Sequence, residues 1–227
     1  MGLKESGLRA SLRSVSTGVS AIPDSDIYLQ DDWGDNKLTD REDSGTTTHN
    51  GVEGVYRPEW ETLEFQTTPS VDDGELEVGS GEGIYTDINL NLDEQIHWEF
   101  DIDFSDGGSG GSNSGGVILY SETVDEASFR DSFVQNSYVF FFINRDGGDI
   151  RLLRYDDDDD SQIVADDGLG NDVSVEITRS PGGEWELIID DSSVGTGTDD
   201  TYTDVNYTGF TARDEIVEFS VNEYKVS

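Results

Sequence analysis

The fold that we expect for this chain of 227 residues is indicated most clearly by one segment, Val173-Ser-Val-Glu-Ile-Thr-Arg-Ser-Pro-Gly-Gly-Glu-Trp-Glu-Leu-Ile-Ile-Asp190. Its centre, Pro181-Gly-Gly183, is a turn signal, and apolar side chains alternate with polar ones on both sides of it. We therefore expect two antiparallel strands, Val173 to Arg179 and Trp185 to Asp190, joined as a hairpin.

A second hairpin is predicted upstream, where Tyr138 to Arg145 returns through Asp146-Gly-Gly148 into Ile150 to Tyr155. The same short alternation, bounded by Gly, Asp, Asn or Ser, predicts further strands. These are Gly74 to Val78, Ile84 to Leu92, Gln95 to Phe104, Gly116 to Ser121, Ser161 to Ala165, Tyr207 to Ala212 and Ile216 to Val226. At least ten strands without a long amphipathic helix predict an all-β fold, a two-sheet antiparallel β-sandwich. We interpret the Gly- and Ser-rich stretch 106–116 as a loop within one domain.

The composition is strongly acidic: 51 Asp and Glu against 13 Lys and Arg give a net charge of −38. At 0.1 M salt the Debye length is about 10 Å, so this charge repels itself, whereas multimolar salt screens it. We interpret this excess of acidic over basic residues as typical of proteins from haloarchaea. Ten Phe, nine Tyr and four Trp in alternating runs indicate a packed core rather than disorder. The charge also argues against a nucleic-acid partner, because phosphate contacts need clustered cations.

Several classes of protein are excluded or disfavoured by what the sequence lacks. Without cysteine there is no disulfide, thiolate metal site or Cys nucleophile. The longest apolar run, Val139 to Ile143, is far shorter than the roughly 20 residues that span a bilayer, so we expect no membrane insertion. The first 22 residues lack the apolar core of a Sec signal and the paired arginines of a twin-arginine signal. No phosphate loop or dinucleotide fingerprint is present, and we predict no cofactor.

The opening segment, Met1 to Ile22, is the one place where basic residues outnumber acidic ones. Composition alone favours a disordered terminus; the alternative is an arm that orders against a partner, since its apolar and basic side chains suit an acidic partner surface. We therefore divide the chain into a docking arm, residues 1–22, and a β-sandwich domain, residues 23–227. The docking residues that we predict are Leu3, Leu8, Arg9, Leu12 and Arg13.

The strand Gln95-Ile-His-Trp-Glu-Phe-Asp-Ile-Asp-Phe104 places Glu99, Asp101 and Asp103 on one face. Three carboxylates on a strand face resemble the Glu-x-Asp-x-Glu strand of concanavalin-like glycoside hydrolases, in which one acts as nucleophile and another as acid/base. Here the last position is Asp rather than Glu. In so acidic a chain we favour a solvated strand face and expect no enzyme, with hydrolysis or lysis of a polysaccharide as the alternative.

We predict no metal site. The run Asp156 to Asp160 lacks the spacing of a calcium loop, and we interpret it as a solvated acidic turn. The two histidines exclude a multi-histidine zinc site; His97 is expected at the surface beside Trp98, and His49 in a loop.

Aromatic residues beside polar ones are the remaining site candidates, because an aromatic face next to carboxylates or amides suits a sugar. We predict ligand binding by Tyr120, Phe129, Arg130 and Asp131, in a loop region between two strands. An anchoring role for this loop is an equal alternative. Trp98 and Trp185 are expected in the core, whereas the sequence does not place Trp33 and Trp60.

The aromatic run Tyr138 to Ile143, the returning Asp149-Ile-Arg-Leu-Leu-Arg154 and the hairpin Val173 to Asp190 resemble the second half of a laminin-G or concanavalin A-like jelly roll. The resemblance covers roughly residues 74–226. Asp191 stands where the family pattern ends in Gly, and the calcium ligands of the family are not assignable to positions of this chain.

The first sixty residues resemble virion proteins of tailed viruses that infect haloarchaea. The resemblance lies in Met1-Gly-Leu-Lys-Glu-Ser-Gly-Leu-Arg-Ala-Ser-Leu-Arg13, Ile22-Pro-Asp24, Asp31-Asp-Trp-Gly-Asp-Asn-Lys-Leu-Thr-Asp-Arg41 and Gly51-Val-Glu-Gly-Val-Tyr-Arg-Pro-Glu-Trp60. It implies a structural protein of a tail fibre, baseplate or capsid turret, assembled in the host cytoplasm. The partners that we expect are other virion proteins, through residues 1–22, and a host-surface glycan or glycoprotein, with copies of the chain forming a homo-oligomer. A purely architectural spacer without a ligand is the alternative.

Overall fold

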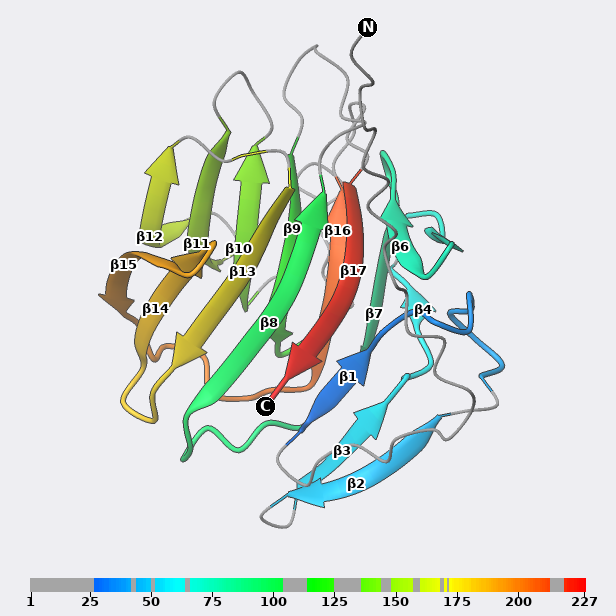
Figure 1. Cartoon of the computed structure of the whole chain (residues 1–227). Coiled ribbons are helices and arrows are strands. Elements are labelled where there is room, and N and C mark those ends of the chain that lie inside the picture. Colours follow the sequence, from blue (N-terminus) through cyan, green and yellow to red (C-terminus); the bar gives the residue numbers. More distant parts are fainter. Residues whose placement is uncertain are drawn as a thin grey trace, which may run out of the picture.

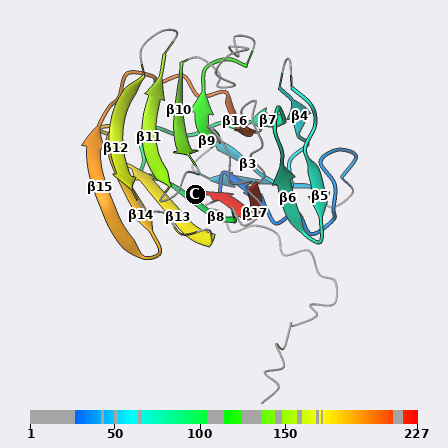
Figure 2. The ribbon, with the colours of Figure 1, turned by 90° about the horizontal axis from the view of Figure 1, so that it is seen from above.

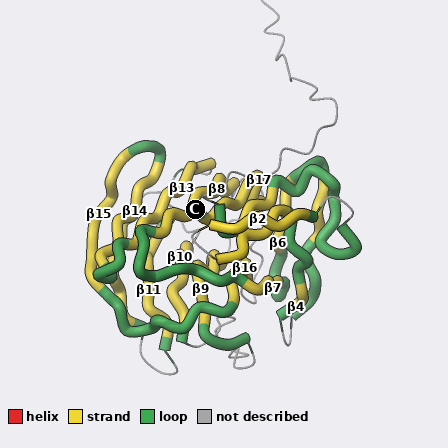
Figure 3. Tube along the Cα trace, turned by 90° about the horizontal axis from the view of Figure 1, so that it is seen from below, coloured by secondary structure: helices red, strands yellow, loops and turns green. Residues whose placement is uncertain are grey.

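The computed structural model describes residues 27–41, 44–49, 52–63, 66–103, 114–124, 136–143, 148–156, 160–167, 170, 172–212 and 219–227. Within these ranges every regular element is a β-strand, and Figure 3 shows strands and loops only. In this part of the chain no helix could cross a membrane. The docking residues Leu3, Leu8, Arg9, Leu12 and Arg13 lie outside the described residues.

The described strands form two sheets that pack face to face (Figures 1 and 2). The ten-stranded sheet has the order β15 (Ser192–Thr198), β14 (Glu184–Ile189), β13 (Asp172–Arg179), β8 (Ile96–Asp103), β17 (Phe219–Val226), β1 (Leu29–Asp31), β3 (Val52–Tyr56) and β2 (Gly45–His49), with β6 (Glu75–Val78) also paired to β17 and β5 (Ser70–Asp72) to β6. The seven-stranded sheet has the order β12 (Ser161–Asp167), β11 (Asp149–Tyr155), β10 (Ser137–Ile143), β9 (Ser114–Ser121), β16 (Tyr207–Ala212), β7 (Gly83–Asp87) and β4 (Glu61–Thr62). The predicted all-β sandwich is confirmed.

The strands of both predicted hairpins pair antiparallel, β13 with β14 and β10 with β11. In the β13–β14 hairpin, Ile177 pairs with Leu187 and both side chains are buried. At its turn, Gly183 has a φ of 73°, a left-handed conformation that favours glycine. The strands β10 and β11 pair antiparallel throughout their seven residues.

Strand β17 pairs with β8 along one side and with two different strands along the other. Its first part pairs with β6, through Phe219 and Val78, and its last part pairs with β1, through Val226 and Leu29. The next pair, β1 with β3, is parallel, while the other named strand pairs are antiparallel. Gly54 makes this parallel approach possible, since a Cβ there would lie 2.0 Å from the Ile27 carbonyl oxygen.

On the opposite side the two sheets close onto each other, where β12 lies against β15 (Figure 2). A Cβ on Gly197 would lie 2.5 Å from the Ile163 carbonyl oxygen, so a side chain there would separate the strands. Strand β15 was not predicted, because Ser192-Ser-Val-Gly-Thr-Gly-Thr198 lacks apolar alternation.

The core between the sheets is rich in aromatic rings. Trp98 of the ten-stranded sheet stacks at 5.7 Å on Trp185 and at 6.3 Å on Tyr120 of the facing sheet. Phe142 and Phe219 meet edge to face at 5.0 Å, again across the two sheets. Trp98 and Trp185 are each no more than 1% exposed, which confirms their predicted burial. Such pairs contribute about 0.5–1.5 kcal/mol each beyond their buried area.

Trp33 and Trp60, which the sequence does not place, form a second aromatic cluster around a buried ion pair. Their rings lie 5.5 Å apart, and both are no more than 1% exposed. The Trp60 indole N–H donates to Asp31 at 2.8 Å, and the Arg41 Nη2 donates to the same carboxylate at 2.8 Å. Arg41 also donates to the Pro58 carbonyl, so the pair ties the 31–41 segment to the chain before β4.

Candidate functional site

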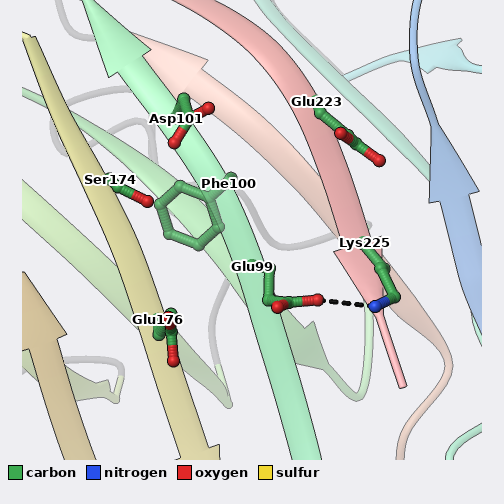
Figure 4. Close-up of a pocket in the computed structure, with 7 residues that line it drawn as sticks. All are labelled: Glu99, Phe100, Asp101, Ser174, Glu176, Glu223 and Lys225. Atoms are coloured by element: carbon green, nitrogen blue, oxygen red, sulfur yellow. Dashed lines mark hydrogen bonds and ion pairs between the residues drawn. The ribbon is translucent and has the colours of Figure 1, made fainter. Parts of the chain in front are cut away.

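The three carboxylates of β8 lie on the outer face of the ten-stranded sheet, as the alternation predicts. Trp98 and Phe100 between them are buried, whereas Asp101 is exposed and Glu99 is partly exposed. The Lys225 ammonium, on the neighbouring β17, lies 2.7 Å from a Glu99 carboxylate oxygen (Figure 4). Strand pairing therefore gives one of the three carboxylates a cationic partner.

A shallow depression of about 280 Å³ runs over this outer face, and we call it the face groove. The side chains and backbone that line it are Glu99, Phe100, Asp101, Ser174, Glu176, Glu223 and Lys225 (Figure 4). The β13–β8 register places Glu176 opposite Glu99 and Ser174 opposite Asp101. Glu176 also lies 3.4 Å from the Nε2 of His97, which is partly exposed on the same face.

The face groove offers hydrogen-bond acceptors and negative charge but little apolar surface. Its only aromatic lining residue, Phe100, is 3% exposed, so no ring is available for a sugar to stack on. Cleavage of a glycosidic bond needs one carboxyl group as acid and a second as base or nucleophile on either side of the bond. Glu99 is held by Lys225, while Asp101 projects into solvent, so the geometry suits binding of polar or cationic groups better than hydrolysis.

The other residues predicted to bind ligand do not assemble into a described site. Tyr120 lies in β9, within the predicted strand Gly116 to Ser121; its side chain is fully buried, and its hydroxyl donates to the Tyr202 carbonyl at 3.1 Å. Its ring belongs to the core cluster and does not face solvent. Phe129, Arg130 and Asp131 lie outside the described residues.

Two further expectations differ from the structure. His49, expected in a loop, is the last residue of β2. The strand expected over Ile84 to Leu92 ends at Asp87. The alternation continues beyond it, since Ile88 and Leu90 remain buried, but the ladder to β16 extends only as far as the hydrogen bond from the Ile88 N–H to the Asn206 carbonyl.

A larger groove, of about 610 Å³, lies where β7 ends and where β1 and β16 begin, and we call it the end groove. Its lining residues are Tyr28, Val55, Asp87, Ile88, Asn89, Val205, Asn206 and Tyr207. Two buried residues, Tyr28 and Ile88, contribute to it, while Asp87, Asn89 and Asn206 are exposed. A third depression, of about 490 Å³, crosses β13, β14 and β15 and is lined mainly by Thr, Ser and Glu.

Backbone pairing fixes the walls of the end groove. The Tyr28 N–H donates to Val226 at 2.8 Å, and its carbonyl accepts from Val55 at 2.7 Å, which sets β3 beside β1. Across the groove, Asp87 pairs with Tyr207. The Asn206 N–H donates to Ser121 at 3.0 Å, and its side-chain amide donates to the Glu122 carbonyl at 2.7 Å, so this residue is held at several points.

The pKa values of two tyrosines around the end groove, Tyr28 and Tyr85, are raised. Burial and then the neighbouring Glu94 carboxylate raise the pKa of Tyr28. The ring of Tyr207 meets Tyr85 edge to face at 5.5 Å, and the hydrogen bond from the Tyr85 hydroxyl to Glu61 raises the pKa of Tyr85 to about 12. The Tyr85 ring and this hydrogen bond therefore support Tyr207 from behind.

The chemistry of the end groove differs from that of the face groove. Val55, Val205 and Tyr207 supply apolar surface, while Asp87 and Asn89 supply a carboxylate and an amide in reach of solvent. This combination of apolar contact and a few polar groups is what small-molecule sites use. The end groove was not predicted, because its residues come from separate segments between positions 28 and 207 that only the strand pairing brings together.

No protein-family model matches the sequence, and no curated protein matches it. Solved structures do match. The Emp47p carbohydrate recognition domain has a TM-score of 0.56 at 12% identity, covering 74% of this chain and 87% of that one. The carbohydrate-binding module CBM66 from Bacillus subtilis has a TM-score of 0.53 at 10% identity, covering 74% and 94%. The legume lectin-like domain from Entamoeba histolytica has a TM-score of 0.51 at 11% identity, covering 74% and 89%.

At these identities the likeness shows the fold alone. The chain has the two-sheet β-sandwich fold of these domains, the concanavalin A-like fold that the resemblance of its second half implies. Among the described residues, no group of three or more His, Asp or Glu side chains is arranged to hold a metal ion.

Proposed function

We propose that this chain is a non-enzymatic glycan-binding module that holds a sugar in the end groove. The observation that carries the proposal is the pairing of exposed Asp87 and Asn89 with the apolar surface of Val205 and Tyr207, on a fold shared with carbohydrate recognition domains. Carboxylate and amide groups would hydrogen-bond sugar hydroxyls, while the apolar wall would cover a C–H face of the ring.

We further propose that the module belongs to a structural virion protein of a halophilic tailed virus. This part rests on the sequence: the acidic composition and the resemblance of the first sixty residues to such virion proteins. The arm, residues 1–22, would dock on other virion proteins, and the sandwich would face the host surface. Several copies in one particle would raise the avidity of a weak sugar site.

The binding step is tested by co-sedimentation with haloarchaeal envelopes in multimolar NaCl. Envelopes with intact surface glycans are compared with chemically stripped ones. We expect saturable binding that stripping abolishes, and we expect Tyr207→Ala or Asp87→Asn to weaken it at least tenfold. Glu99→Gln and Glu223→Gln, in the face groove, are matched controls that should bind as the wild type does. Equal binding to both kinds of envelope would rule out the glycan as ligand, and no binding to either would favour the architectural spacer.

The docking step has a separate test. Deletion of residues 1–22 should leave the sandwich folded in high salt, as judged by tryptophan fluorescence, but should prevent incorporation into particles. Incorporation of the truncated chain at the normal level would refute the docking role.

A glycoside hydrolase or lyase remains the second candidate, because Glu99 and Asp101 share the face groove. It predicts release of reducing ends from host polysaccharide and their loss in Glu99→Gln. The same variant, used above as a binding control, therefore separates the two functions.

A further inference from the structure

Arg179 is a buried guanidinium without a carboxylate partner among the described residues. The residue is 1% exposed in a chain that carries 51 acidic residues. Its Nη1 donates to the Ser180 carbonyl at 3.2 Å, and its Cζ lies 5.8 Å from the centroid of the Trp185 ring. Its Nε–H has no hydrogen-bond partner in the described structure.

Other arginines that are buried or partly buried have acidic partners. Arg41 pairs with Asp31, and Arg154 pairs with Asp199 at 2.7 Å. Arg57, which is more exposed, pairs with Asp32 at 2.7 Å. Arg179 differs from these because, within the part of the chain that the structure describes, it forms no ion pair with a carboxylate.

The carboxylate of Asp199 lies beside the aromatic rings around Arg179. It acts on the same Tyr120 hydroxyl as Arg179, but it is itself paired with Arg154 and accepts from Tyr138. Arg179 ends β13, where it pairs with Trp185 on one side and Ile96 on the other. Its guanidinium lies close enough to the Tyr120 hydroxyl to oppose the rise that burial gives to the pKa of that tyrosine. The Trp98 indole N–H, in the same ring cluster, also lacks a partner in the described structure.

An unpaired charge in this position is costly. A guanidinium does not lose its proton at accessible pH, so the charge cannot be removed by titration. Leaving a buried ion without a counter-charge is strongly destabilising, and orphaned N–H donors add to the cost. The contact with Trp185 and the Ser180 carbonyl offset only part of it. A single negative charge with no fixed hydrogen-bond geometry would complete the site.

We propose that one small monovalent anion, chloride, binds inside the sandwich beside Arg179. It accepts from the Nε–H and neutralises the guanidinium. The net charge of −38 gives the protein surface no general affinity for anions, so this site is selective for an ion small enough to enter the core. The site does not involve the end groove and stands whether or not the protein binds glycan.

Bromide in place of chloride tests the site directly. Crystals of the full chain grown in NaBr should give one anomalous-difference peak in contact with the Arg179 guanidinium, and excess NaCl should displace it. Arg57→Met is the matched control and should leave the peak unchanged, because Arg57 has Asp32 as its partner. A non-anomalous water in that position, or no density there, would overturn the proposal.

A measurement in solution covers the case in which the variant does not crystallise. Chloride is replaced stepwise by gluconate at a constant sodium concentration, and the thermal midpoint is followed. We expect the removal of chloride to lower the thermal midpoint of the wild type by several degrees more than that of Arg179→Met. The midpoint of the variant should respond only to general anion effects. Equal slopes for the two proteins would overturn the proposal. If Arg179→Met does not fold, the wild-type bromide map decides.

Discussion

At the scale of single residues, a few buried charges hold segments together in a protein whose other charges mostly face water. Asp31 and Arg41 have fully buried side chains, and the carboxylate also accepts from the Trp60 indole. Burying both charges costs desolvation free energy. A substitution that removes only one of them leaves the other buried without a counter-charge and is therefore strongly destabilising.

We predict that Arg41→Met lowers the free energy of unfolding by about 3–5 kcal/mol, since it leaves Asp31 buried and unpaired. Arg57→Met removes the guanidinium from Asp32, whose side chain is 40% exposed, and should cost about 1 kcal/mol or less. Urea unfolding in high salt measures both. Equal losses for the two variants would show that burial of the Asp31–Arg41 pair has no special role.

Asp199 makes a pH-dependent contribution to the free energy of unfolding. Burial alone would raise the pKa of its carboxyl, but hydrogen bonds from Tyr138 and Thr201 outweigh this and lower it. Because its folded-state pKa is below the unfolded value of about 3.9, the carboxylate stabilises the fold above that pH. The stabilisation is lost as the pH falls through the folded-state value.

We therefore predict that Asp199→Asn lowers the free energy of unfolding by about 1–3 kcal/mol at pH 7 and that the difference shrinks below about pH 4. Asp200→Asn, at the exposed neighbouring position, is the control and should have little effect. Urea midpoints across this pH range check the prediction. A difference that stays constant with pH would mean that the ionised carboxylate is not the stabilising group.

At the scale of elements, a strand can be predicted from the sequence when one of its faces is buried and the other is not, because its apolar and polar side chains then alternate. Strands β8 and β13 show full alternation, and their positions were predicted to within one or two residues. Strand β15 was not predicted, because Gly195 and Gly197 allow close packing against β12 without burial of side chains and its Thr196 and Thr198 are exposed. The three-residue β1 was not predicted as a strand of its own. It contains Asp31, which is buried, whereas a sequence pattern leads one to expect an aspartate in solvent.

The same reasoning applies to the candidate sites. The carboxylates of the face groove lie on one strand, so their spacing revealed them. Residues of the end groove are brought together by the pairing of Asp87 with Tyr207 and by the placement of β3 beside β1, and neither is visible in local patterns. Tyr120 lies in a predicted strand, but the burial of its side chain was not predicted, because a buried tyrosine near a strand end has the same local pattern as an exposed one.

We predict that Gly54→Ala destabilises the protein by about 1–3 kcal/mol, because its Cβ would overlap the Ile27 carbonyl oxygen and force β3 away from β1. Gly45→Ala, in the partner strand β2, meets no atom within 4 Å and should change stability by no more than about 0.5 kcal/mol. Thermal unfolding in high salt compares the two. Equal effects would contradict the close approach of these strands.

At the scale of the whole molecule, charge governs the conditions under which the sandwich is stable. The net charge of −38 is screened over about 3 Å at 1 M salt, against about 10 Å at 0.1 M. We predict that the chain unfolds as salt is withdrawn and that KCl and NaCl restore it. The four tryptophans are buried, so a red shift of their emission reports the transition. Emission that is unchanged between 0.1 M and 4 M salt would contradict the prediction.

NMR of the isotope-labelled protein in high salt shows whether a glycan occupies the end groove. Oligosaccharides released from haloarchaeal envelopes are titrated while backbone amide shifts are followed. We predict saturable shifts at Asp87, Asn89, Asn206 and Tyr207, with Glu99 and Glu176 unchanged. Shifts confined to the face groove, or none at all, would contradict the account.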